Sequence, residues 1–128
     1  MIMSSATFCL GLAIYFEGRG ETLLGQNLIA NTIENRVNSK HYPNNYCDVM
    51  TENKQFSFYN NVKDINSLKT TDHEALTAAI EVAEKYVKNK TIYHNACHYT
   101  THAINNKWTK NLKVVIEEGG HKFMEGGC

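Results

Sequence analysis

The sequence has no excess of charge of either sign and no long apolar run. Its 128 residues include 13 basic and 13 acidic side chains, so the formal net charge is zero. Because the charges cancel and the basic residues do not interleave with aromatic ones, we expect no nucleic-acid partner. No apolar stretch approaches the roughly 20 residues that span a bilayer, so we expect no membrane insertion. The length predicts a single domain over residues 1–128, which we expect to be a monomer.

The four cysteines are widely spaced and include no C-x-x-C pair. This spacing argues against a zinc ribbon and against a dithiol redox motif. Cys9 lies in an apolar segment and is expected to be a small buried hydrophobic residue, whereas Cys128 is expected to be mobile. Four cysteines also allow three disulfide connectivities. The disulfide state of Cys9, Cys47, Cys97 and Cys128, and with it the redox compartment, therefore stays open.

An apolar run over residues 6–16 comes early in the chain and leads into Glu17, Gly18 and Arg19. Its length predicts a buried helix, and the glycine just past its end is typical of a helix terminus. The run has no charged segment before it and has Glu17 and Arg19 directly behind it, which is not typical of a signal peptide. We therefore expect the protein to be made in the cytoplasm without a signal peptide.

Two further helices are expected, followed by a small antiparallel sheet. Apolar residues at helical spacing predict a helix over residues 26–38. A capping box of Thr71 and Glu74 predicts another helix, which ends near Asn89. Residues 46–69 are polar and rich in asparagine, and we expect them to be an irregular binding loop. The expected strand-like pieces are residues 91–93, 97–100, 113–116 and 121–124, the last two joined by a hairpin connection over 117–120.

Glu17 lies where the first predicted helix leaves the core, beside two aromatic residues. Loss of hydration raises the pKa of a carboxyl group, and an acid that stays protonated near neutral pH can protonate a leaving oxygen. Structural ion pairs are more common than catalytic acids, so the residues alone favour a structural acid paired with Arg19 or Arg36. Glu21 has the same two interpretations, a loop-bracing acid or a second carboxylate, and the first is favoured.

The histidines invite a metal interpretation. His94, His98 and His102 occur at every fourth position, with Cys97 among them. On a helix this spacing would place three ligands on one face. The segment is predicted to be strand-like, however, and no glutamate accompanies it as in an H-E-x-x-H motif. We therefore predict no metal site and no other cofactor.

Seven short motifs, in order along nearly the whole chain, resemble those of the SleB-type cell-wall hydrolases, the family of the spore cortex-lytic enzyme. The first is the segment over residues 13–21, which resembles the family's Y-x-E-[AGS]-R-G-E motif. The others, in chain order, are Gly25-Gln26 with Ile33-Glu34-Asn35-Arg36-Val37, Tyr42-Pro43-Asn44 with Cys47-Asp48-Val49, Gln55-Phe56-Ser57, His98-Tyr99, Trp108 and Gly120-His121-Lys122-Phe123. Thr100 and Thr101 depart from the family's pattern, which affects the expected substrate preference and not the reaction class.

The resemblance implies an α+β domain that is lysozyme-like and related to the lytic transglycosylases, with helices first and a small antiparallel sheet afterwards. It also implies a peptidoglycan-degrading enzyme with Glu17 as the catalytic acid and base, and with Glu21 as a supporting or second carboxylate. The implied substrate-binding residues are Gln55, Phe56, Ser57, His98, Tyr99, Trp108 and His121. A catalytic domain without the separate wall-binding domain of the spore enzymes looks like a phage endolysin, which reaches the bacterial wall through a holin.

The reaction expected from this resemblance is cleavage of the β-1,4 bond between N-acetylmuramic acid and N-acetylglucosamine. Glu17 donates a proton to the glycosidic oxygen and then takes one from the C6 hydroxyl of the muramic acid, whose attack on C1 leaves a 1,6-anhydro end. An internal nucleophile removes the need for the second carboxylate of ordinary glycosidases. Three alternatives stay open: a lysozyme-type muramidase, a metal-dependent N-acetylmuramoyl-L-alanine amidase, and a non-catalytic wall-binding module.

Overall fold

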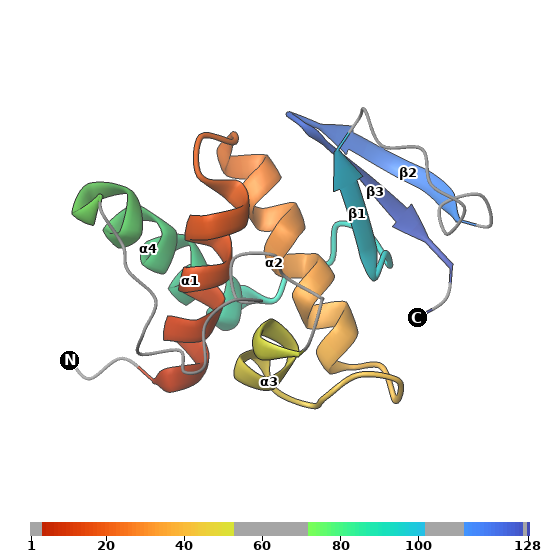
Figure 1. Cartoon of the computed structure of the whole chain (residues 1–128), viewed down its shortest axis with the longest axis horizontal. Coiled ribbons are helices and arrows are strands. Elements are labelled where there is room, and N and C mark those ends of the chain that lie inside the picture. The colour runs from red at the N-terminus through yellow and green to blue at the C-terminus, as the bar shows by residue number, and fades with distance from the viewer. Residues whose placement is uncertain (1–3, 53–71, 102–111, 127) are drawn as a thin grey trace.

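The computed structural model describes residues 4–52, 72–101, 112–126 and 128, and in these residues helices precede a small antiparallel sheet. Figure 1 shows the helices gathered around α1, with the sheet beside α2. The helices are α1 (Ser5–Gly18), α2 (Leu23–Val37), α3 (Tyr46–Thr51) and α4 (His73–Asn89). The strands are β1 (His98–Thr101), β2 (Lys113–Glu118) and β3 (His121–Glu125), in the spatial order β1-β3-β2.

Helix α1 is the centre of the hydrophobic core, as the apolar run predicts. The side chain of Ser4 caps it by accepting from the Thr7 amide, and most of its apolar residues are buried, the others being partly buried. A helix that is apolar all round must be covered all round, and α1 packs against α2, α3 and α4. Gly11 permits a close approach of α4, because a Cβ at this position would lie 2.9 Å from Ile80 Cγ1. The last turn of α1 therefore has a fixed position relative to the rest of the domain.

The predicted helix boundaries need three corrections. Helix α2 begins at Leu23 and not at residue 26, because the Thr22 side chain caps it by accepting from the Gly25 amide. The predicted capping box is wrong, since the cap of α4 is Asp72, whose side chain accepts from the Ala75 amide; Thr71 lies outside the described residues. Within the segment expected to be irregular, residues 46–51 form α3, whose buried Tyr46, Val49 and Met50 belong to the core.

The sheet confirms the predicted strands with one exception. Antiparallel pairing places Tyr99 opposite Phe123, and β2 and β3 are joined at a tight turn over Gly119 and Gly120. The exception is the piece over residues 91–93, which is not a strand. Its last residue, Tyr93, is held by α2 and not by strand pairing, because the Tyr93 amide donates to the Asn31 side chain at 2.6 Å. None of the described helices is long and apolar enough to cross a membrane.

All four cysteines form disulfides. Cys9 of α1 is bonded to Cys47 of α3, and Cys97, which precedes β1, is bonded to Cys128. Cys9 is buried, as expected, but it is bonded to Cys47, and the expectation of a mobile Cys128 is wrong. Wide spacing hid the pairs, because each one joins segments more than 30 residues apart that only the tertiary fold brings together.

Removal of the second disulfide is expected to destabilise the protein strongly. Cys97 and Cys128 are separated by 31 residues, and opening a loop of this size restores about 3–4 kcal/mol of chain entropy to the unfolded state. We expect the Cys97→Ala/Cys128→Ala variant to lose that much free energy of unfolding in denaturant titrations. The Cys9→Ala/Cys47→Ala variant, with a separation of 38 residues, is the matched comparison and should lose a similar amount. Unchanged denaturation midpoints would contradict the assigned pairs.

Candidate active site

Glu17 and Tyr99 form the centre of the candidate site. Glu17 lies in the last turn of α1, and Tyr99 lies in β1, 82 positions further along the chain. The Tyr99 hydroxyl donates a hydrogen bond of 2.9 Å to Glu17 Oε1. The residues alone predicted an acid at a helix end but gave no partner for it from the sheet. The geometry brings together two of the residues that the family resemblance assigns to the site.

The environment of Glu17 favours its protonated form. Burial raises the pKa of the carboxyl group, while the hydrogen bond from Tyr99 and the positive charge of Arg36 act in the opposite direction; the net pKa is raised. A carboxyl group with a raised pKa keeps its proton closer to neutral pH and can act as a general acid. Burial and the neighbouring Glu17 hold the pKa of Tyr99 well above its ordinary value, so Tyr99 remains a donor.

The two arginines proposed as ion-pair partners of Glu17 have other contacts. The Arg19 guanidinium donates to the Tyr15 hydroxyl and lies 5.1 Å from the centre of that ring. Arg36 donates through Nε to the Cys97 carbonyl at 2.7 Å. Within the described part of the chain, no ion pair joins either arginine to Glu17. The geometry therefore does not show Glu17 as a structural acid in an ion pair with Arg19 or Arg36.

Glu21 binds the hairpin turn between β2 and β3. Its carboxylate accepts from the Gly120 amide at 3.2 Å, and His121 Nδ1 lies 3.4 Å from Oε1. The next residue, Thr22, donates to Glu118 Oε1 at 2.9 Å. These contacts attach the segment between α1 and α2 to the turn that joins β2 and β3.

His121 connects the two carboxylates. Its ring meets the edge of Tyr99 at right angles, with the ring centres 5.1 Å apart, while its Nδ1 faces Glu21. Glu17, Tyr99, His121 and Glu21 thus form one continuous cluster across α1, the following loop and the sheet. Four residues assigned by the family resemblance belong to this cluster.

The remaining assigned residues are not part of this cluster. His98 is adjacent to Tyr99 in β1, and alternation along a strand places its side chain on the opposite face of the sheet. The other four lie outside the described residues: Gln55, Phe56, Ser57 and Trp108.

Sequence reasoning missed the polar residues of α2 that hold the segment before β1. Asn31 is fully buried, and its side-chain oxygen accepts from the amides of Tyr93 and His94. Asn35 donates to the carbonyls of His94 and Ala96, at 3.0 and 2.8 Å. The signal is the pair of asparagines four residues apart, which share one helix face, but a helical pattern alone does not show whether such a polar face is solvated or buried.

His94 has a structural role. It is buried, its Nδ1 accepts from the Ala96 amide at 2.9 Å, and its Nε2 lies 3.0 Å from the Leu28 carbonyl. Because Nδ1 accepts, the proton is on Nε2, which donates to that carbonyl. Of the other histidines considered for a metal site, His102 lies outside the described residues. In the described ranges, no group of three His, Cys, Asp or Glu side chains is placed to hold a metal ion.

Comparison with solved structures defines the class of the protein. The chain matches the catalytic domain of the germination-specific lytic transglycosylase SleB from Bacillus anthracis with 26% identity and a TM-score of 0.76, over 96% of this chain and 97% of that one. It matches the catalytic domain of the Bacillus cereus SleB protein with 24% identity and a TM-score of 0.74, over 97% and 93% of the two chains. The fold is therefore the α+β, lysozyme-like fold of the SleB catalytic domains, as the resemblance implied.

The family follows from the sequence itself. A family model described as Cell Wall Hydrolase matches residues 20–124. The chain belongs to the cell wall hydrolase family, which makes it an enzyme that cleaves peptidoglycan. The matched segment includes Glu21, Tyr99 and His121 and begins just after Glu17. A search of curated protein sequences finds no match.

The Tyr99→Phe substitution tests the central hydrogen bond. The Tyr99 hydroxyl donates to the charged carboxylate and so lowers the pKa of Glu17. Its removal should raise that pKa further, which carboxyl-carbon NMR titration measures directly. Tyr46→Phe is the matched control, because the Tyr46 hydroxyl donates to Glu34 and not to Glu17. An equal pKa of Glu17 in wild type and Tyr99→Phe would refute the contact.

The Gly119→Ala substitution tests the contact between Glu21 and the hairpin. Gly119 has a φ of 56°, and a Cβ there would lie 1.7 Å from Glu21 Oε2, so the carboxylate must move. Gly20 is the matched control, since its φ is also positive, at 88°, and a Cβ there would meet nothing within 4 Å. We expect both variants to lose about 1–2 kcal/mol of stability from the left-handed backbone. Gly119→Ala should lose more in thermal unfolding, and equal losses would argue against the contact.

Proposed function

We propose that this enzyme is a lytic transglycosylase that cleaves the β-1,4 bond between N-acetylmuramic acid and N-acetylglucosamine, with Glu17 as the general acid and base. The observation that carries the proposal is the half-buried Glu17 with a raised pKa and a hydrogen bond from Tyr99. The SleB neighbour from Bacillus anthracis is described as a lytic transglycosylase, which supports the same reaction class here.

In the proposed mechanism, protonated Glu17 donates its proton to the glycosidic oxygen as the bond to C1 breaks. The resulting carboxylate then takes the proton of the muramic C6 hydroxyl, and the oxygen of that hydroxyl bonds to C1. The products are a 1,6-anhydro-muramic end and a free N-acetylglucosamine 4-hydroxyl. Tyr99 has two uses: it orients the carboxyl group, and it stabilises the carboxylate that forms after the first proton transfer.

The contacts of Glu21 support an internal nucleophile. Glycosidases that hydrolyse their substrate use a second carboxylate as nucleophile or base. The nearest such candidate, Glu21, accepts from the Gly120 amide and lies beside His121. Both contacts engage the Glu21 carboxylate with the hairpin, whereas Glu17, whose pKa is raised by burial, has the Tyr99 hydroxyl as its hydrogen-bond donor. We therefore assign Glu21 to positioning of the hairpin and of His121.

Glu17→Gln tests the assignment of the catalytic acid. A glutamine can keep the contact with Tyr99 but cannot donate a proton to the leaving oxygen, and general acid catalysis typically contributes about 10²–10⁴-fold. We expect the variant to remain folded and to clear a suspension of purified walls at least about 100-fold more slowly. Glu21→Gln is the matched comparison and should retain more activity, since the amide oxygen still accepts from Gly120. Lysis by Glu17→Gln at the wild-type rate would overturn the assignment.

The products distinguish the proposed reaction from its rivals. Mass spectrometry of digested peptidoglycan should show muramic ends that lack one water relative to a hydrolysed end. Reducing muramic ends would instead indicate a muramidase and would require Glu21 to be reconsidered as a second carboxylate. Release of stem peptides from intact glycan would indicate an amidase. Binding to walls without any soluble product would indicate a non-catalytic module.

A further inference from the structure

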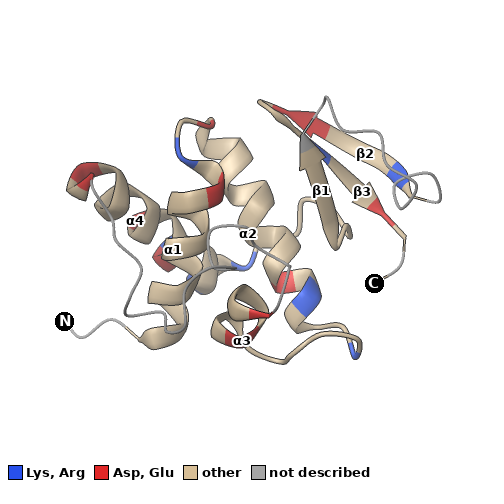
Figure 2. Ribbon diagram, viewed as in Figure 1, with Lys and Arg blue, Asp and Glu red and all other residues tan. Residues whose placement is uncertain are grey.

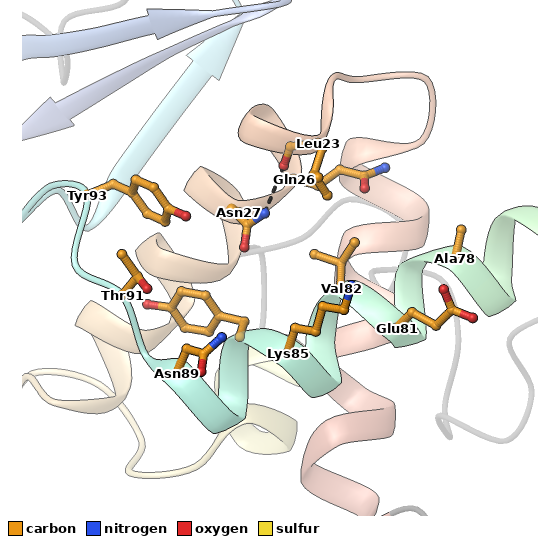
Figure 3. A pocket seen from close by; sticks show the side chains of 11 residues that line it. Leu23, Gln26, Asn27, Ala78, Glu81, Val82, Lys85, Asn89, Thr91 and Tyr93 are labelled. Atoms are coloured by element: carbon orange, nitrogen blue, oxygen red, sulfur yellow. Dashed lines mark hydrogen bonds between the residues drawn. The ribbon is translucent and has the colours of Figure 1, made fainter.

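A cavity of about 410 Å³ lies between α2, α4 and the segment that leads to β1. Figure 3 shows Tyr93, Thr91 and Asn89 at one end, α2 residues along one side and α4 residues along the other. Its volume lies within the range of about 300–1,000 Å³ that is usual for small-ligand sites. The lining residues are Leu23, Gln26, Asn27, Ala78, Glu81, Val82, Lys85, Tyr86, Asn89, Thr91 and Tyr93.

The cavity is distinct from the candidate active site. None of the four residues of the Glu17 cluster lines it. Its walls come from α2, α4 and the segment that leads to β1, whereas the cluster is built from the end of α1, the following loop and the sheet. A ligand in this cavity would therefore not occupy the position of the scissile bond.

Several lining side chains are available to a ligand. Asn27 donates through its amide nitrogen to the Leu23 carbonyl at 3.0 Å, drawn as a dashed line in Figure 3, which leaves its Oδ1 as an acceptor. The side chains of Asn89, Thr91 and Tyr93 form no hydrogen bond with the described part of the chain. Amide and hydroxyl groups of this kind both donate and accept, which matches the hydroxyl and acetamido groups of an amino sugar.

Tyr93 gives the cavity an aromatic wall. Its side chain is 41% exposed although it is a large aromatic residue, and its backbone amide is fixed by the bond to Asn31. An exposed tyrosine has an apolar face and a polar tip, and a sugar ring offers an apolar C–H face together with hydroxyl groups. Leu23, 67% exposed, and Val82 add apolar surface that suits the methyl of an acetyl group.

The charges of the lining cancel, and over the described part of the chain acidic and basic residues are likewise interspersed (Figure 2). Glu81 and Lys85 both lie on α4, and in Figure 3 Glu81 lies at the end of the cavity away from Tyr93. Tyr93, Thr91 and Asn89, which line the opposite end, are themselves uncharged and rich in hydrogen-bonding groups. A neutral sugar fits this end better than a stem peptide, which carries carboxylate and ammonium groups.

We propose that this cavity is a second glycan-binding site, which takes an N-acetylated hexosamine unit of the peptidoglycan strand against Tyr93. The choice of ligand rests on the proposed function, since it takes the glycan of the wall as the substrate. When the active site and this cavity bind one strand or neighbouring strands, an enzyme that is released at one site remains held at the other. Rebinding at the first site is then intramolecular. The site would thus hold the enzyme on the wall between successive cleavages.

The test uses the Glu17→Gln variant, in which cleavage is expected to be slow, and triacetylchitotriose as the probe. Amide NMR spectra should show saturable shifts at residues 91–93 and at the Asn27 side-chain amide. Tyr93→Ala, added to Glu17→Gln, should raise the dissociation constant at these positions at least tenfold. Ile92→Ala is the matched control, because Ile92 is the adjacent residue, is 72% exposed and does not line the cavity; it should leave the constant unchanged.

Two results would overturn the inference. One is a titration in which only the region of Tyr99 and His121 shifts. The other is a dissociation constant at residues 91–93 that Tyr93→Ala does not change while its spectrum remains that of the folded protein. Either result leaves the proposed function standing if the wild-type enzyme still produces anhydro ends. Conversely, binding at the cavity by an enzyme that yields only reducing ends would refute the transglycosylase and not the second site.

Discussion

The site depends on the hydrogen bonds that α2 makes with the backbone of residues 93–97. Asn31 accepts from two consecutive amides of this segment, Asn35 donates to two of its carbonyls, and Arg36 donates to the Cys97 carbonyl. Each buried backbone group left without a partner would cost about 1–3 kcal/mol. The segment leads directly into β1, so these contacts determine where Tyr99 lies relative to the end of α1. The same contacts fix the backbone of Tyr93.

The chemistry of Glu17 results from a balance between burial and partners. Burial favours the neutral acid, while Tyr99 and Arg36 favour the carboxylate. With no partner, the pKa of the group would be higher still, so it would give up its proton less readily in the first half of the proposed reaction. With an ion pair, it would be charged at neutral pH and unable to donate. In the proposed mechanism, the hydrogen bond from the neutral Tyr99 hydroxyl avoids both extremes, which would let one residue serve in both steps.

The sequence predicts the elements better than it predicts the contacts between them. Apolar periodicity locates α1, the end of α4 and the strands to within a few residues, because each pattern reflects which face is buried. Helix α3 was missed because six residues carry too little periodicity, and its burial comes from packing on α1. Glu17 was found through an ordered set of motifs. Its contact with Tyr99 was not, because the two residues lie 82 positions apart.

The different roles proposed for the two glutamates follow from their surroundings and not from their separation of four residues. Glu21 accepts from a backbone amide and faces an imidazole, and both of these partners belong to the hairpin. The partner of Glu17 is the Tyr99 hydroxyl, whose own pKa is raised. Tyr99 therefore stays neutral and donates a hydrogen bond without placing a positive charge beside the carboxylate. In the proposed division of roles, the carboxylate that is engaged with the hairpin positions the site, and the other one exchanges protons with the substrate. A carboxyl group that must exchange protons cannot be held by a permanent positive charge, and Arg36, the nearest candidate, has its Nε bound to the Cys97 carbonyl.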